Sequence, residues 1–174
     1  MVKTHVSILF LSLLLVGCSL FETLNPKPEL PETTTNGANT FGALVNRKVW
    51  EIRNSFRMRS HYLNSEYISI SGNYRSKEID QHLIIQISNE PIAEGDYVFN
   101  KSLYLDRLLS WADDKLDQYF SGDDPNVTFN GTLTIFKLDR SNKIVSGTFE
   151  FQIHKAGEAT VNIGNGRFDM IYGQ

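Results

Sequence analysis

The chain has 174 residues, 41% of them apolar, and its 17 basic and 20 acidic residues give a formal charge of −3. This balance offers no basic stripe long enough to neutralise a phosphate backbone, so nucleic acid is excluded as an expected partner. The single cysteine, Cys18, has no partner for a disulfide within the chain.

The first 17 residues have the pattern of a lipoprotein signal peptide. A short region with Lys3 precedes an apolar stretch from Val6 to Val16, which is too short to span a bilayer but has the length of a signal-peptide core. The segment Leu15–Cys18 reads LVGC, a lipobox, in which small Gly17 suits the lipoprotein signal peptidase. The sequence therefore predicts cleavage before Cys18 and lipidation of its thiol.

Lipidation at Cys18 predicts membrane lipid as the first partner of the mature chain. Each buried methylene contributes about 0.8 kcal/mol, so the two or three acyl chains of a lipoprotein, palmitate among them, make attachment effectively permanent. A buried core cysteine is the alternative, but it fits poorly between an apolar run and a proline-rich stretch. Because Ser19 is not the aspartate that retains enterobacterial lipoproteins in the inner membrane, we expect the cell envelope and favour the outer membrane.

Residues 18–40 are expected to form a disordered tether behind the lipidated cysteine. Three of the five prolines, Pro26, Pro28 and Pro31, lie in this stretch, and a Thr/Asn/Gly run without periodicity follows them. The folded body is then expected over residues 41–174, a normal size for one domain that buries a sufficient core without disulfides.

From Phe41 to Asn100, short runs alternate apolar and polar residues between Gly, Asn, Asp and Pro, which indicates antiparallel strands. Between Lys48–Arg53 and Tyr67–Gly72, a further alternating run places Phe56, Met58 and Tyr62 on the inner face. The expected strands are Phe41–Val45 and Lys48–Arg53, joined by a two-residue turn, then Tyr67–Gly72, His82–Ser88 with its leucine and isoleucines inward, and Tyr97–Asn100.

The segment Leu103–Phe120 has two interpretations. Apolar residues fall at helical spacing there, which predicts one amphipathic helix. Alternatively, Ala112–Lys115 forms a turn between two short strands, which keeps the sheet topology uninterrupted.

The C-terminal part shows the clearest alternation. Within Lys143–His154, Val145 and Phe149 share one face with other apolar residues, while Glu150 shares the opposite face with polar ones, as in a strand with one wet face. Further strands are expected at Thr132–Leu138, Ala159–Ile163 and Arg167–Tyr172, the last two separated by a tight bend at Gly164–Gly166. The fold class is therefore all-β, an antiparallel meander that forms a two-sheet sandwich or a flattened barrel.

Three sequence blocks resemble a family of uncharacterised lipoproteins of the Bacteroidota. They are TFGALVNRKVW at Thr40–Trp50, GTLTIFKLDRSNKIVSGTFEF at Gly131–Phe151, and VNIGNGRFDMIY at Val161–Tyr172. The chain departs from that family at Arg47, where glycine is common. The resemblance implies a Gram-negative cell envelope and an all-β fold, and it implies no activity or catalytic residue.

The sequence predicts no catalytic residue, no cofactor and no metal. Neither a Gly-x-Ser-x-Gly elbow nor a His-Glu-x-x-His helix is present. The histidines of the mature chain, His61, His82 and His154, are expected on the polar faces of separate strands. Asp123 and Asp124, in an acidic region that starts at Asp106, are the candidates for calcium, although Asp-Asp-Pro-Asn also suits an ordinary solvated turn.

Two further sets of residues have a functional and a plain interpretation. One comprises aromatics that form either a sugar-stacking platform or core: Trp50, Tyr97, Tyr104, Trp111, Tyr119 and Phe120. The other, the stripe Arg57, Arg59 and His61, either meets an anionic ligand or keeps a wet strand face soluble.

Three classes of function follow, in order of preference. The first is a membrane-anchored, non-catalytic binding or interaction module whose partner is an envelope protein or a glycan. The second is a carrier of a small apolar ligand in a lipocalin-like barrel. The third is a glycan-acting enzyme, since glycosidase carboxylates leave no local sequence signature.

Overall fold

The computed structural model describes residues 29–52, 55–63, 65–114, 116 and 118–173. The predicted signal peptide, Cys18 and the first part of the predicted tether lie outside the described residues. No helix in the described part of the chain has the length and apolar character needed to cross a bilayer.

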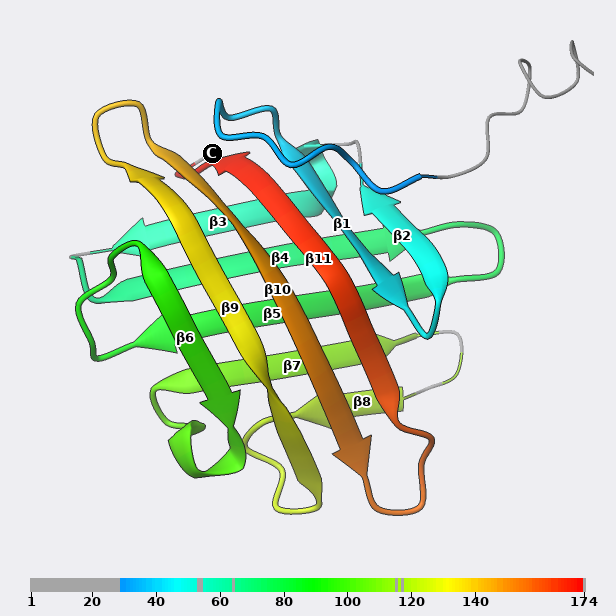
Figure 1. Cartoon of the computed structure of the whole chain (residues 1–174). Coiled ribbons are helices and arrows are strands. Elements are labelled where there is room, and N and C mark those ends of the chain that lie inside the picture. The colour runs from blue at the N-terminus through cyan, green and yellow to red at the C-terminus, as the bar shows by residue number, and fades with distance from the viewer. Residues whose placement is uncertain (1–28, 53–54, 64, 115, 117, 174) are drawn as a thin grey trace, which may run out of the picture.

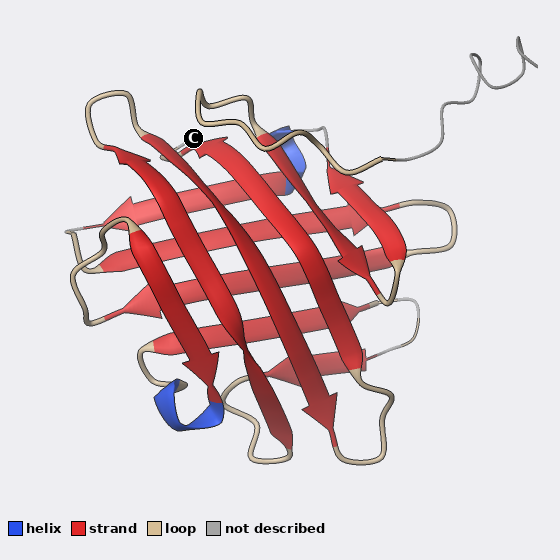
Figure 2. Ribbon diagram, in the orientation of Figure 1, coloured by secondary structure: helices blue, strands red, loops and turns tan. Residues whose placement is uncertain are grey.

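The described chain folds into two antiparallel sheets packed face to face, which confirms the all-β class and the sandwich form of the prediction (Figures 1 and 2). The first sheet has the strand order β2 (Lys48–Ile52), β1 (Thr40–Val45), β11 (Val161–Ile171), β10 (Ile144–Lys155), β9 (Val127–Asp139) and β6 (Gly95–Asn100). The second sheet has the order β3 (Met58–Leu63), β4 (Tyr67–Arg75), β5 (Asp80–Ser88), β7 (Arg107–Asp113) and β8 (Gln118–Ser121). Two short 3₁₀ helices, η1 (Ser55–Arg57) and η2 (Lys101–Leu103), lie in the connections.

The two sheets cross at a steep angle: the strands of the first sheet run diagonally in front of those of the second in Figure 1. Apolar side chains from both inner faces fill the space between them, among them Phe41, Ile70, Ile85 and Phe99, each at most 1% exposed. Within the described residues, this interior is the hydrophobic core that the alternating patterns predict.

The first hairpin forms where it is predicted, with Asn46 and Arg47 as its turn. Both residues have positive φ, 47° and 69°, as a type I′ turn requires. Arg47 thus adopts the left-handed conformation that glycine takes with least strain. Asn162 of β11 fixes the turn, because its carbonyl oxygen accepts from the Asn46 N–H at 2.8 Å and its own N–H donates to Asn46 Oδ1 at 2.9 Å.

Strand β10 confirms the predicted alternation, with one exception. Val145, Phe149 and Phe151 are buried toward the second sheet, while Glu150 is exposed on the outer face. Ser146 also lies on the outer face but is fully buried, because the N-terminal segment of the chain covers it. Its hydroxyl donates to the Asp169 carboxylate of neighbouring β11 at 2.6 Å.

The segment that covers Ser146 comprises residues 31–39, called here the N-terminal strap. Asp169, 1% exposed, accepts hydrogen bonds from the Thr34 hydroxyl at 2.6 Å and from the backbone N–H groups of Asn36, Gly37 and Ala38 at 2.9–3.0 Å. The tether is predicted to reach residue 40, whereas the structure packs its last part against β1 and β11. Composition alone does not reveal this packing, because the hydrogen-bond acceptor for the strap is the buried carboxylate of Asp169, far along the chain.

Four other expectations differ from the structure in whole or in part. Leu103–Phe120 forms β7 and β8, so the two-strand interpretation is correct and the helix is wrong. The meander is interrupted, because β6 pairs with β9 in the first sheet while β5 pairs with β7 in the second. Gly164–Gly166 is not a bend between strands but an irregularity in the register of a continuous β11 opposite β10. Phe56, expected inward, is 89% exposed.

Candidate functional site

A groove with a volume of about 250 Å³ lies on the outer face of the second sheet and is called here the basic groove. It is lined by Phe56, Arg57, Arg59, Ser71, Gly72, Asn73, His82, Leu83 and Ile84. The side-chain period of two brings the polar members to one face, since residues at alternate positions of β3, β4 and β5 point outward. The ladder register places Arg59 beside Ser71 and Asn73 beside His82.

The basic groove carries positive charge that the described residues do not neutralise. Arg57 donates to the Arg75 carbonyl oxygen at 3.2 Å, and neither Arg57 nor Arg59 forms an ion pair with an acidic side chain of the described residues. Asn73 has a buried side-chain oxygen without a hydrogen-bond donor in the described part of the chain. Buried polar atoms are usually satisfied, so this wall of the groove has unused hydrogen-bonding capacity.

Apolar surface adjoins these cations. Phe56 is 89% exposed at one side of the groove, and Ile84 is 39% exposed on β5. The groove therefore combines guanidinium groups, amide and hydroxyl groups, and an exposed aromatic ring. The predicted cationic stripe contributes Arg57 and Arg59 to the groove, whereas His61 is exposed but does not line it.

His82 connects the basic groove to a second cluster. Its Nε2 lies 3.1 Å from Asp114 Oδ2 and 3.7 Å from Asp80 Oδ1. The other oxygen of Asp80 is 2.7 Å from an Arg75 guanidinium nitrogen. Asp80 is buried, His82 is half-buried and Asp114 is exposed.

The remaining histidines and acidic residues stay apart. His154 is exposed and contacts Thr160, and the structure brings neither it nor His61 to His82. Asp124 accepts from the Asn126 N–H at 2.8 Å and lies 3.7 Å from Lys155, which together hold its pKa below the ordinary value. These contacts fit the interpretation of an ordinary solvated turn. They give no support to a calcium site at Asp123 and Asp124.

The aromatic platform does not form as one surface. Trp50, Tyr97, Trp111 and Phe120 are at most 7% exposed and belong to the core. Tyr104 is half-buried beneath the Lys101 ammonium group, and Tyr119 is 60% exposed. A cleft of about 350 Å³ at one end of the sandwich reaches both tryptophans, but these rings pack against each other with centroids 5.8 Å apart.

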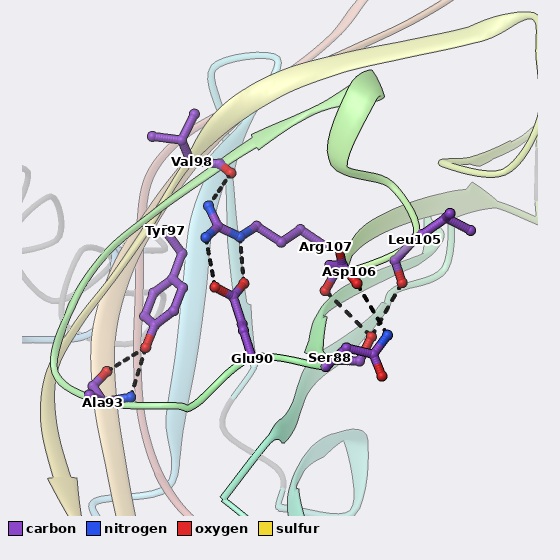
Figure 3. A network of polar contacts seen from close by, with 9 residues as sticks. Ser88, Glu90, Ala93, Tyr97, Val98, Leu105, Asp106 and Arg107 are labelled. Atoms are coloured by element: carbon purple, nitrogen blue, oxygen red, sulfur yellow. Dashed lines mark hydrogen bonds and ion pairs between the residues drawn. The ribbon is translucent and has the colours of Figure 1, made fainter.

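A polar network around Arg107 joins the two sheets. Figure 3 shows Arg107 of β7 held by both oxygens of Glu90, at 2.6 and 2.9 Å, and by the Val98 carbonyl oxygen of β6 at 2.7 Å. In the loop that contains Glu90, the Tyr97 hydroxyl group accepts from the Ala93 N–H and donates to the Ala93 carbonyl oxygen. Its charged groups are paired with one another, so we assign this network to fixing the crossover from the second sheet to the first.

The sequence pattern predicts His82 on a polar face but does not reveal its two carboxylate neighbours. Asp80 lies two residues earlier on β5, a spacing that puts both side chains on one face of a strand. That spacing is a sequence signal for two of the three residues of the cluster. Asp114 follows β7, and only the pairing of β5 with β7 brings it there.

Comparisons with models of protein families, with curated proteins and with solved structures found no match.

Proposed function

We propose that this protein is a lipid-anchored lipoprotein of the bacterial cell envelope, at the outer membrane, and that its β-sandwich is a non-catalytic module that binds acidic glycans. The lipobox ending at Cys18 and the resemblance to Bacteroidota lipoproteins support the anchor and the location. The observation that carries the binding function is the basic groove, with Arg57 and Arg59 unpaired to any acidic side chain of the described residues.

The chemical groups that line the basic groove favour acidic glycans as ligands. A guanidinium group is a planar fork that pairs with carboxylate, sulfate or phosphate through two parallel hydrogen bonds. Asn73 and Ser71 offer hydrogen bonds to hydroxyl groups, and the exposed ring of Phe56 offers an apolar surface to a sugar ring. A glycan with acidic groups uses all three features at once, whereas a neutral glycan leaves the arginines unused.

The two other classes of function gain less support. The described interior is filled by side chains of both sheets, which leaves the apolar carrier without a supporting observation. For a glycosidase, two carboxylates are needed on opposite sides of a bound sugar. Asp80 and Asp114 instead lie next to each other on the same side, both against His82.

Arg59→Ala should weaken the binding of an acidic oligosaccharide about tenfold or more, because a charge-assisted hydrogen bond contributes about 1.5–3 kcal/mol and 1.4 kcal/mol is tenfold. Isothermal titration calorimetry of the mature lipoprotein in mild detergent measures this with oligogalacturonate as carboxylated probe, a heparin oligosaccharide as sulfated probe and a dextran oligosaccharide as neutral probe. Binding of the acidic probes should weaken as salt concentration rises.

Arg47→Ala is the matched control, because Arg47 is an exposed arginine in the β1–β2 turn away from the basic groove. It should leave the affinity within about twofold. Equal binding of dextran and the acidic probes, no binding of any probe, or equal losses in both arginine variants would contradict the proposal.

Mass spectrometry of the membrane-extracted protein should find a chain that begins at lipidated Cys18. Cys18→Ala removes the only thiol and should release the protein from membranes, because the anchor consists of acyl chains on that residue. Fractionation of membranes and soluble material, followed by immunoblotting, measures the release. An unprocessed Met1 start, or a free Cys18 thiol on the membrane-bound protein, would refute the anchor.

A further inference from the structure

We propose that Asp80, His82 and Asp114 form a binding site for a divalent transition-metal ion such as Zn²⁺, and that the site binds Zn²⁺ in preference to Ca²⁺ and Mg²⁺. One imidazole nitrogen and two carboxylate oxygens are available, and these three atoms all lie within 4.8 Å of one another. The site adjoins the basic groove through His82, but its assignment does not depend on glycan binding.

The distances between the donor atoms fit a tetrahedral ion. Zn²⁺ binds nitrogen and oxygen at about 2.0–2.2 Å, which places neighbouring donor atoms about 3.3–3.6 Å apart around a tetrahedral ion. His82 Nε2 lies 3.1 Å from Asp114 Oδ2 and 3.7 Å from Asp80 Oδ1. Small rotations of two side chains therefore suffice to bring the three donors onto one ion.

The backbone holds the donors in place before any ion binds. Asp80 and His82 lie two residues apart on β5 and share its outer face. The Asp114 N–H donates to the Asp80 carbonyl oxygen at 2.8 Å, which ties the third donor to the same strand. The site is thus built on paired strands in the way that gives metal ligands a fixed geometry.

Arg75 acts as an outer-shell partner and not as a competitor. It contacts Asp80 Oδ2 at 2.7 Å, whereas Oδ1 is the oxygen that faces His82. Hydrogen bonds of this kind orient the ligating carboxylates of metal sites. Its own side chain is 55% exposed, so water screens the repulsion between the guanidinium group and a bound cation.

The donor set distinguishes among metal ions. Ca²⁺ and Mg²⁺ take oxygen ligands, and Ca²⁺ takes six to eight of them. An imidazole with two carboxylates suits Zn²⁺, which is commonly bound by three protein ligands with a fourth position open to water or another ligand. His82 also lines the basic groove, so the open position of the ion lies near that groove.

Calorimetric titration of the chelator-treated mature lipoprotein with ZnCl₂ tests the site. We expect saturable binding of one Zn²⁺ per chain, a raised Tm in the presence of Zn²⁺, and no competition from a hundredfold excess of Ca²⁺ or Mg²⁺. X-ray absorption should show one nitrogen and otherwise oxygen donors. His82→Gln and Asp114→Asn should each weaken Zn²⁺ binding about tenfold or more and abolish the shift in Tm.

His154→Gln and Asp106→Asn are the matched controls, because they change the same residue types on exposed or unrelated parts of the surface. Both should retain the affinity of the unchanged protein within about twofold. The Asp114 side chain is 57% exposed, so Asp114→Asn reports on the ion even if His82→Gln alters folding. Absence of saturable binding, binding that survives both site variants, or equal competition by Ca²⁺ would overturn the assignment.

Discussion

Asp169→Asn should destabilise the folded protein by about 3–5 kcal/mol. The carboxylate is 1% exposed and accepts five hydrogen bonds, from the hydroxyl groups of Thr34 and Ser146 and from three backbone N–H groups of the N-terminal strap. An amide loses the charge that strengthens these bonds and turns an NH₂ group toward N–H donors. Removing one partner from a buried charged network is among the costlier single changes.

Urea denaturation measures this loss, with Asp96→Asn as its control. Asp96 is an exposed aspartate of the first sheet that accepts from one hydroxyl group, that of Thr134, at 2.6 Å. Its replacement should change the free energy of unfolding by no more than about 1 kcal/mol. Limited proteolysis should cut within residues 31–39 in Asp169→Asn only. Equal effects of the two substitutions would show that Asp169 does not anchor the strap.

The same carboxylate gives stability a defined pH dependence. Burial by itself raises the pKa of Asp169, but the hydrogen bonds from Ser146, Thr34, Ala38 and Gly37 outweigh it and hold the pKa below the ordinary value. Because the folded pKa is the lower one, the stabilisation is complete above the unfolded pKa of about 3.9 and is lost as the pH falls toward the folded pKa. Asp169→Asn should lack this part of the acid-induced loss of stability.

The first hairpin and the alternation of β10 could be predicted because local patterns determine them. Asn46 and Arg47 connect two short apolar runs across a two-residue turn, and the period of two in Val145–Ile153 fixes which side chains point inward. The same rule places Ser146 correctly on the outer face but does not predict that its side chain is buried. A segment more than a hundred residues earlier in the chain covers it. Alternation assigns a face to each residue, but it does not reveal what covers that face.

Leu103–Phe120 shows why a helical pattern can mislead. Leu109 is buried as either interpretation expects, but Leu105 and Leu116, which complete the helical stripe, are 72% and 65% exposed. The paired residues of β5 and β7 decide the outcome, because tertiary strand pairing overrides the local pattern. A single sequence contains no direct sign of that pairing.

The candidate sites were predictable only in part, for the same reason. Arg57 and Arg59 are close in sequence, so their shared face is visible in the chain itself. Asp80 and His82 share a face of β5 through their local spacing, but Asp114 reaches them only through the ladder between β5 and β7. Chemistry that depends on non-local strand pairing leaves no motif in the sequence, and this limits the prediction of sites in all-β domains.

Phe149→Ala should cost about 3–5 kcal/mol, a large share of the 5–15 kcal/mol that stabilises a typical domain. Phe149 is 3% exposed and lies within an aromatic cluster, with ring centroids 5.2 Å from Phe41, 6.0 Å from Phe151 and 6.4 Å from Phe168. Its ring also lies against Gly166 of β11, where an added Cβ would come within 2.3 Å of it. Truncation would leave a cavity in this cluster.

The size of the effect depends on whether that cavity can collapse. Phe41, Phe151 and Phe168 lie on β1, β10 and β11, which are joined to one another by backbone ladders, so their rings cannot move into the vacated volume without disturbing the sheet. Glu150→Ala is the control one residue away: its side chain is exposed on the outer face, and the change should stay within about 0.5 kcal/mol. Urea denaturation compares the two, and a glutamate change as damaging as the phenylalanine change would mean that the register of β10 is wrong.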